Sequence, residues 1–231
     1  MKIMKNIRLK KFLEREINIM LVSVIFGTVF AVLISTQIYA ENVQNEIADN
    51  VIRFHVVANS DSYTCLALKE HVRDGVLNRF GGLVCPTADI EESREILTEN
   101  LVEIAEFAGR LIHHEGYDYP VLAVMDQVFF PTKTYGDISF PAGVYEAVRI
   151  VIGTGSGNNW WCVMFPPLCY VDVATPAPDD YTLLRQLLSD ETYALMNHSQ
   201  GDVSITIRFK IVEWWQERMQ QEQPPILYAQ R

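Results

Sequence analysis

Positive charge is scarce in this chain. Its 231 residues include 19 Lys and Arg against 29 Asp and Glu, giving a net charge of −10 at pH 7. The first 40 residues hold six basic and two acidic side chains, a net of +4, which leaves −14 for residues 41–231. An acidic body is repelled by nucleic acid and by anionic lipid surfaces. The charge therefore argues against a nucleic-acid partner and favours a protein partner or a freely soluble domain.

Several other features are missing. The sequence contains four cysteines but no CxxC pair, and its five histidines are scattered, so no zinc site is expected. No repeat or low-complexity tract is present, and hydrophobic residues make up 49% of the chain. That composition suits one ordered domain with a sizeable core. Nothing in the pattern implies a metal or a cofactor.

One long apolar run is present near the N-terminus. Ile17–Ala40 contains no charged residue, and as a helix it would be about 36 Å long, enough to cross a bilayer core. Basic residues precede it, so residues 1–16 should be cytoplasmic and 41–231 extracytoplasmic. Ala40 is a candidate signal-peptidase site, but the run is longer than that of a usual signal peptide. A cleaved signal and a retained membrane anchor both remain open.

Outside the cytoplasm the cysteines can be oxidised. Cys162 and Cys169 flank a Phe-Pro-Pro turn, and a bridge between them would close a short loop. A second bridge, Cys65–Cys85, is conceivable but weaker, because Cys65 falls on the apolar face of a predicted helix, where a buried thiol would lie. We therefore predict the Cys162–Cys169 disulfide.

The hydrophobic pattern predicts an α+β fold, a single domain with a mixed, mainly antiparallel sheet packed by helices. Strands are expected at Val51–Ala58, Pro120–Phe130, Asp137–Phe140, Val144–Ile152, Trp160–Phe165 and Val203–Ile211. Helices are expected from about Ser62 to Phe80, where Gly81-Gly82 should stop the first, and at about Ala88–His114 and Tyr181–Leu188, with a short terminal one carrying Trp214 and Trp215.

The turn Asn59-Ser60-Asp61-Ser62 has two interpretations. In a catalytic interpretation, Ser60 would be the nucleophile of a secreted hydrolase, His55 its base and Asp61 the acid that orients the base. A triad needs those groups to meet in space, however, and closeness in sequence does not ensure it. Ser and Asp are also the residues that cap helix N-termini. We favour capping of the following helix by Ser60, Asp61 or Ser62, and predict no catalytic residue.

Two further features invite a binding role. The stretch Gly153–Asn159 is glycine-rich, but it lacks the Lys and the following helix of a phosphate-binding loop, so a flexible hairpin loop is expected. Trp160 and Trp161 follow it, and neighbours on a strand point to opposite faces. Exposed tryptophan is common at interaction hot spots, so packing and partner binding are equally good interpretations.

Three long segments resemble one known family. They are Ile52–Leu77 (IRFHVVANSDS…LKEHVRDGVL), Phe130–Ile152 (FPTKTYGDISFPAGVYEAVRIVI) and Gly155–Val171 (GSGNNWWCVMFPPLCYV), and the ending Phe209–Trp215 (FKIVEWW) also fits. Their order and spacing, behind an apolar leader, resemble stage II sporulation protein R. Cys65 and Cys85 do not look like features of that family.

The resemblance implies a signalling protein that is made in the forespore and exported to the space between the two septal membranes. There, members of the family activate a membrane-embedded aspartic protease of the mother cell, which processes a pro-sigma factor. The implied protein is not an enzyme, needs no cofactor, and touches the membrane through its N-terminal helix if uncleaved. The residues expected to bind the partner are Arg53, Asp61, Gly155, Gly157, Trp160 and Trp161.

Overall fold

The computed structural model describes residues 2–84, 89–169 and 181–197. Its helices are α1 (Lys2–Asp49), α2 (Tyr63–Val76), the π-helical turn η1 (Leu77–Gly81), α3 (Gly82–Val84), α4 (Ile90–Glu99), α5 (Leu101–His114), α6 (Thr182–Leu187) and α7 (Asp190–Met196). Its strands are β1 (Ile52–Val57), β2 (Val121–Phe130), β3 (Lys133–Tyr135), β4 (Ile138–Phe140), β5 (Gly143–Ile152) and β6 (Asn159–Phe165).

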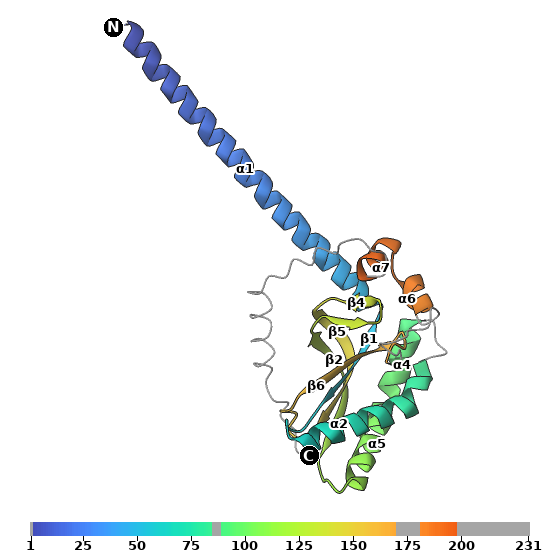
Figure 1. Cartoon of the computed structure of the whole chain (residues 1–231). Coiled ribbons are helices and arrows are strands. Elements are labelled where there is room, and N and C mark those ends of the chain that lie inside the picture. Colours follow the sequence, from blue (N-terminus) through green and yellow to red (C-terminus); the bar gives the residue numbers. More distant parts are fainter. Residues whose placement is uncertain (1, 85–88, 170–180, 198–231) are drawn as a thin grey trace. The chain divides into compact units, whose positions relative to one another are not determined.

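The chain divides into two units, residues 1–45 and 46–231. The first unit is most of α1, which has 48 residues and is drawn as one continuous helix in Figure 1. Its part from Arg15 onward is the one described helix that is long and apolar enough to span a membrane, and the apolar window lies fully exposed. A signal sequence has the same properties, so cleavage after Ala40 stays a prediction. The second unit is the body of the protein.

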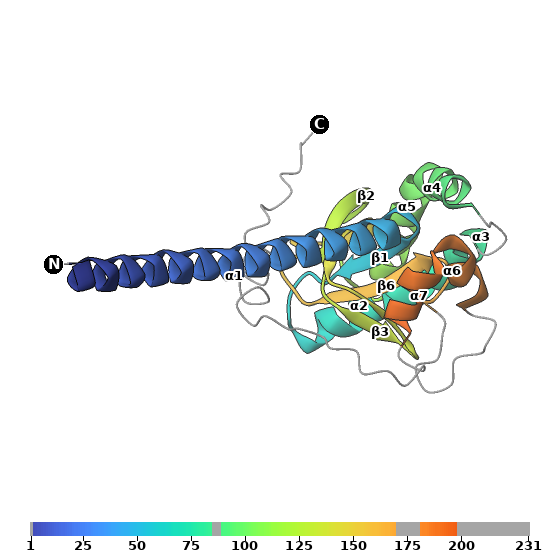
Figure 2. The same cartoon turned by 90° about the horizontal axis from the view of Figure 1, so that it is seen from above.

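A four-stranded sheet in the order β2-β5-β1-β6 forms the centre of the body. β1 pairs with β5 in parallel and with β6 in the antiparallel sense, while β2 and β5 are antiparallel. Figures 1 and 2 show β1 between these neighbours. A separate two-stranded sheet, β3-β4, joins Lys133–Tyr135 to Ile138–Phe140. The predicted α+β class with a mixed, mainly antiparallel sheet is confirmed.

All six β1 residues are buried, so both faces of this strand are covered. On one face Phe54 meets the ring of Trp160 edge-on, and Arg73 of α2 lies over the same indole, which places this face beneath α2. α5 packs beside α2 and contacts β2. Arg53 and His55 lie on the other face, where aromatic side chains of β2, β4, β5 and β6 surround them. This second face holds the unusual polar groups described below.

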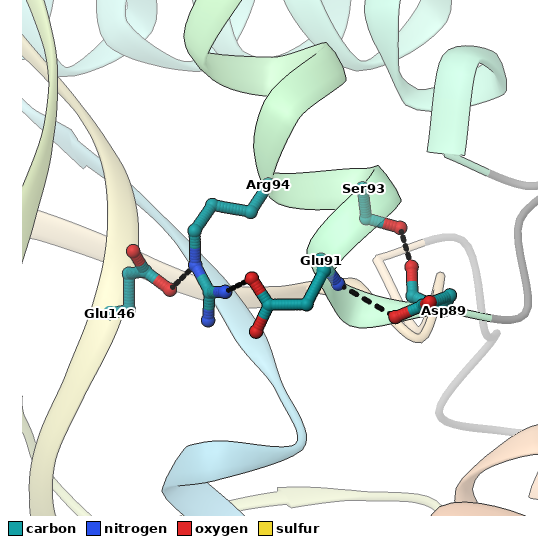
Figure 3. Close-up of polar contacts among 5 residues, drawn as sticks. All are labelled: Asp89, Glu91, Ser93, Arg94 and Glu146. Carbon is teal, nitrogen blue, oxygen red and sulfur yellow. Dashed lines mark hydrogen bonds and ion pairs between the residues drawn. The ribbon is translucent and has the colours of Figure 1, made fainter.

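The short helix α4 is tied to the sheet by one arginine (Figure 3). Asp89 caps the helix, its Oδ1 accepting a hydrogen bond of 2.9 Å from the backbone N–H of Glu91. Arg94 donates through Nε to Glu146 Oε2 of β5 at 2.7 Å and also contacts the Glu91 carboxylate. A half-buried pair of this kind fixes the direction of α4 against β5.

Two helix predictions require correction. The single helix expected at Ala88–His114 is two helices, because the chain changes direction at Asn100, whose side-chain amide donates to the carbonyl of Ile96. Gly81-Gly82 does not stop the first helix either. The helical chain passes from α2 through the π-helical turn η1 and continues as α3, since both glycines keep right-handed helical geometry there.

Other predictions differ in extent. The strands at Val51–Ala58, Pro120–Phe130, Asp137–Phe140, Val144–Ile152 and Trp160–Phe165 are found with ends shifted by one residue or so. The β3 strand and helix α7 were not expected, because each is too short to show a clear period. The predicted strand Val203–Ile211 and the helix with Trp214 and Trp215 lie outside the described residues.

The disulfide between Cys162 and Cys169 is confirmed, with Cα atoms 5.6 Å apart. It joins β6 to the chain just beyond the Phe-Pro-Pro turn. Cys65 is a free thiol, buried on α2 as its helical position predicted. Its conceivable partner Cys85 lies outside the described residues.

Candidate functional site: a glycine clasp and a buried cationic face

The polar turn after β1 begins α2. Ser62 is the N-cap residue, and its Oγ accepts a hydrogen bond of 3.2 Å from the backbone N–H of Cys65. Capping is therefore confirmed, with Ser62 as the cap. Ser60 and Asp61 have other partners, since Ser60 Oγ contacts Ser62 Oγ and Asp61 binds a distant loop.

That distant loop is the glycine-rich stretch after β5. We call Ala58–Asp61 together with Gly153–Asn158 the clasp. Asn59 Oδ1 accepts from the backbone N–H of Thr154 at 2.9 Å, and Asp61 Oδ1 accepts from that of Asn158 at 2.7 Å. The N–H of Gly157 donates to the carbonyl of Ala58 at 2.9 Å. Segments about 95 residues apart are thus joined by backbone and side-chain bonds.

The glycines of the clasp are required by its close packing. A Cβ on Gly157 would lie 2.4 Å from the carbonyl oxygen of Ser60, and one on Gly153 would lie 2.2 Å from Asn59 Oδ1. Gly153 and Gly155 also have positive φ, at 57° and 62°, where other residues are strained. The prediction of a flexible hairpin loop is wrong, because β5 and β6 flank β1 and the loop between them is hydrogen-bonded to the turn.

Cys65 lies against this turn. Hydrogen bonds from Ser60, then Ser62, lower the pKa of its thiol to about 7, against the opposing effect of burial. The Nδ2 of Asn59 lies 3.8 Å from the sulfur, and the hydroxyl of Tyr119 lies 4.0 Å from it. A thiolate is favoured at such a helix N-terminus. The Cys65 side chain is only 5% exposed, however, so the sulfur is buried and has little contact with solvent.

The second face of β1 contains an arginine without a counter-charge. Arg53 is fully buried, donating through Nε to the carbonyl of Cys162 at 2.9 Å and through Nη2 to the hydroxyl of Tyr135 at 3.4 Å. Its guanidinium lies 4.3 Å from the ring centre of Phe130 and 5.0 Å from that of Tyr145. Cation–π contacts offset part of the cost of burying the charge. Within residues 2–84, 89–169 and 181–197, its Nη1 has no hydrogen-bond partner.

His55 lies two residues further along the same face. Its ring stacks on Trp161 with centres 4.0 Å apart, and Nε2 lies 2.9 Å from Asn159 Oδ1. Burial is the main reason that the pKa of this imidazole falls to about 3, and the nearby charge of Arg149 lowers it further. His55 is therefore neutral at physiological pH. Since an amide oxygen accepts, Nε2 carries the proton, and the unpartnered Nδ1 is an acceptor.

The parallel register places Arg149 of β5 directly beside His55. Arg149 Nη1 lies 3.3 Å from Asp126 Oδ2, and Nε is buried without a partner. We call Arg53, His55 and Arg149 the cationic face. In the described part of the chain it holds two guanidiniums against one contacting carboxylate, and each of its three side chains has one nitrogen without a partner.

The hydrolase constellation does not assemble. Among the described residues, no hydrogen bond joins the His55 ring to Ser60 or Asp61. A neutral imidazole with a pKa of about 3 is also a weak base.

The six predicted partner-binding residues fall into three places. Asp61, Gly155 and Gly157 belong to the clasp, while Arg53 is buried in the cationic face. The two tryptophans are half-buried on opposite faces of β6, Trp160 beneath Arg73 and Trp161 against His55. A partner-binding role for these residues stays a prediction.

Sequence reasoning missed Arg149, Asp126 and Asn159. Their signal was weak, since isolated polar residues in apolar strands, such as Glu146 and Arg149 in VYEAVRIVI, have many explanations. What makes Arg149 notable is its register beside His55, which the sequence does not state.

These observations define a class: a compact α+β body that follows a membrane-length helix, with its most conspicuous polar motif used to join two chain segments. Residues 48–175 match the model of the family "Stage II sporulation protein R", and the chain belongs to that family. It is 42% identical over 133 residues to the stage II sporulation protein R of Bacillus subtilis (strain 168), which covers 58% of this chain and 59% of that relative. The alignment thus spans less than two thirds of the curated relative's length. No solved structure matches the chain significantly.

Proposed function

We propose that this chain is an exported sporulation signal that activates a membrane-embedded aspartic protease of the mother cell, so that a pro-sigma factor is processed. The observation that carries the proposal is the family match over residues 48–175, which coincides with most of the folded body. The long apolar helix is compatible with export or anchoring. The proposed place of action is the space between the forespore and mother-cell membranes.

In this proposal the body acts as a ligand. It binds the outer face of the protease and favours the active arrangement of its subunits, a shift between existing states. The candidate contact surface is centred on Trp161, which stacks on His55 and is partly exposed beside the exposed Asn159. An aromatic residue rimmed by polar groups is typical of an interaction hot spot.

The experiment is co-expression of the full chain with the candidate protease and its precursor, with processing followed by the size of the sigma factor. Wild-type chain should increase processing, and Trp161→Ala should reduce it at equal chain abundance. Val102→Ala is the matched control, because Val102 is 71% exposed on α5 and lies away from the sheet. Absence of any increase with wild-type chain would refute the proposal.

The hydrolase alternative is tested in the same assay. It requires the hydroxyl of Ser60, so Ser60→Ala should abolish function without loss of folded protein. The ligand proposal expects Ser60→Ala to keep most of its function, because that hydroxyl contacts Ser62 in the turn and the buried thiol of Cys65 at the start of α2.

A further inference from the structure

The cationic face has an unbalanced charge. Among the residues that the structure describes, Arg53 forms no ion pair, and Asp126 is the one acidic group within ion-pair distance of Arg149. Two cations and one anion leave a net charge of +1, because His55 is neutral. Burying a charge is costly unless an opposite charge or hydrogen bonds compensate it. The clustered aromatic rings offset this cost only in part.

The hydrogen-bonding inventory of this face is also incomplete. Arg53 Nη1, Arg149 Nε and His55 Nδ1 are the three buried side-chain nitrogens or oxygens without a partner in the described part of the chain. All three come from one face of two neighbouring strands, as the register of Arg53 with Ala147 and of His55 with Arg149 shows. A buried polar group that stays unpaired loses its hydrogen bonds to water and gains none in return, which destabilises the folded protein. Two of the three nitrogens, Arg53 Nη1 and Arg149 Nε, are N–H donors of cations and therefore indicate an anionic ligand, whereas His55 Nδ1 is an acceptor that an anion does not satisfy.

Arg149 has the geometry to hold that ligand. A guanidinium usually grips a carboxylate through two nitrogens at once, whereas Arg149 makes one contact of 3.3 Å with Asp126 and leaves Nε unused. The Asp126 side chain is 43% exposed and that of Arg149 is 16% exposed, so a solute can approach from the Asp126 side. The remaining walls are the half-buried Trp161 and the buried Phe130.

We infer that the cationic face binds a carboxylate group, held by the Arg149 fork with His55 beside it and the charge of Arg53 behind. A single negative charge balances the site, which favours a carboxylate over a doubly charged phosphate. The ligand takes the free Nε side of Arg149, while Asp126 stays beside Nη1 as a competing negative charge. The ligand is either a small free acid or the Asp or Glu side chain of a protein partner, and the two sources share this chemistry.

The test uses the full chain in neutral detergent micelles. Sodium formate is titrated against sodium chloride at the same ionic strength, and the unfolding midpoint is read from tryptophan fluorescence. Formate should raise the midpoint by a few degrees beyond chloride, in a saturable way. N-acetyl-aspartic acid amide, with N-acetyl-asparagine amide as its uncharged match, separates the sources: a larger shift with the aspartate compound than with formate indicates a protein side chain, and the reverse indicates a free acid.

Two variants and a control make the test specific. Asp126→Asn removes the competing carboxylate and should lower the half-saturating formate concentration about tenfold. Arg149→Gln should abolish the formate-specific shift. Arg110→Gln, on the exposed side of α5 with one contact of 3.8 Å, should leave it unchanged. The inference is overturned if formate and chloride act alike on both wild type and Asp126→Asn, or if Arg149→Gln keeps the formate-specific shift.

Discussion

The clasp follows the ends of β1 and β5, the same two strands that carry the cationic face, but the polar groups of the two regions are paired in opposite ways. In the clasp, the amide and carboxylate of Asn59 and Asp61 accept hydrogen bonds from backbone N–H groups of the loop after β5. On the cationic face, Arg53, His55 and Arg149 each have a buried nitrogen that no described residue pairs with. Satisfied polar groups define a unique packing, while unsatisfied ones add cost without adding order. The clasp therefore has a structural role, and the cationic face is the better candidate for a ligand site.

The largest expected effect tests whether the clasp stabilises the fold. Gly157→Ala should lower the free energy of unfolding by about 3 kcal/mol, because the new methyl group meets backbone atoms of Ser60 that cannot move aside cheaply. Urea unfolding followed by tryptophan fluorescence measures it. Gly109→Ala in α5 is the control, since nothing lies within 4 Å of its added Cβ, and it should stabilise by about 0.5–1 kcal/mol. Equal stability of the two variants would contradict a tightly packed clasp.

The next effect tests the cationic face. The folded pKa of His55 is about 3 against its ordinary 6.5, so below pH 6.5 the unfolded chain binds more protons than the folded one. The stability linked to neutral His55 is complete above that pH and is lost as the pH falls toward 3. From pH 8 to pH 5 this loss should be about 2 kcal/mol.

The measurement compares wild type with His55→Gln at both pH values. Subtracting the two pH dependences removes the contribution of the exposed histidines His71, His113 and His114, which lie near Glu115 and Asp118. A difference of zero between pH 8 and pH 5 would mean that the imidazole is not buried in solution.

A smaller effect tests whether Asp61 has a structural role in the clasp or belongs to a functional site. Asp61→Ala leaves the N–H of Asn158 without its 2.7 Å partner and should cost about 1–2 kcal/mol in the free energy of unfolding. Asp118→Ala is the control, because that side chain is 94% exposed and has one contact of 3.4 Å, to His113. If Asp61→Ala were as stable as Asp118→Ala yet inactive in precursor processing, Asp61 would belong to a functional site instead.

The smallest effect concerns the cap. Ser62→Ala removes the acceptor for the N–H of Cys65 and should destabilise the body by about 1 kcal/mol. Ser62→Asp should retain most of the stability, since a carboxylate also caps a helix. Loss of stability in Ser62→Asp equal to that in Ser62→Ala would show that Ser62 acts through something other than capping.

Much of the body could be predicted from sequence because local patterns carry it. The β-branched run before Asn59 predicted β1, and the Ser-rich turn predicted a capped helix. The spacing of Cys162 and Cys169 predicted their bridge. The break at Asn100 was missed, because an apolar period of 3.6 continues across it and only the packing of α4 and α5 reveals the change of direction.

The sequence by itself determined the export-type helix, the α+β class, the cap at the start of α2 and the membership of a family that three long segments carry. Tertiary structure decided what the polar residues do. The alternation of side chains along a strand predicts that Arg53 and His55 share one face, but it does not predict that Arg149 lies beside them. A glycine at position 157 indicates backbone freedom, but it does not predict close packing against Ser60. Those contacts join residues about 95 positions apart, and nothing in local spacing encodes which strands become neighbours. The same Asn-Ser-Asp turn that suggested chemistry therefore joins two chain segments, while Arg53, His55 and Arg149 each have a buried nitrogen without a partner among the described residues.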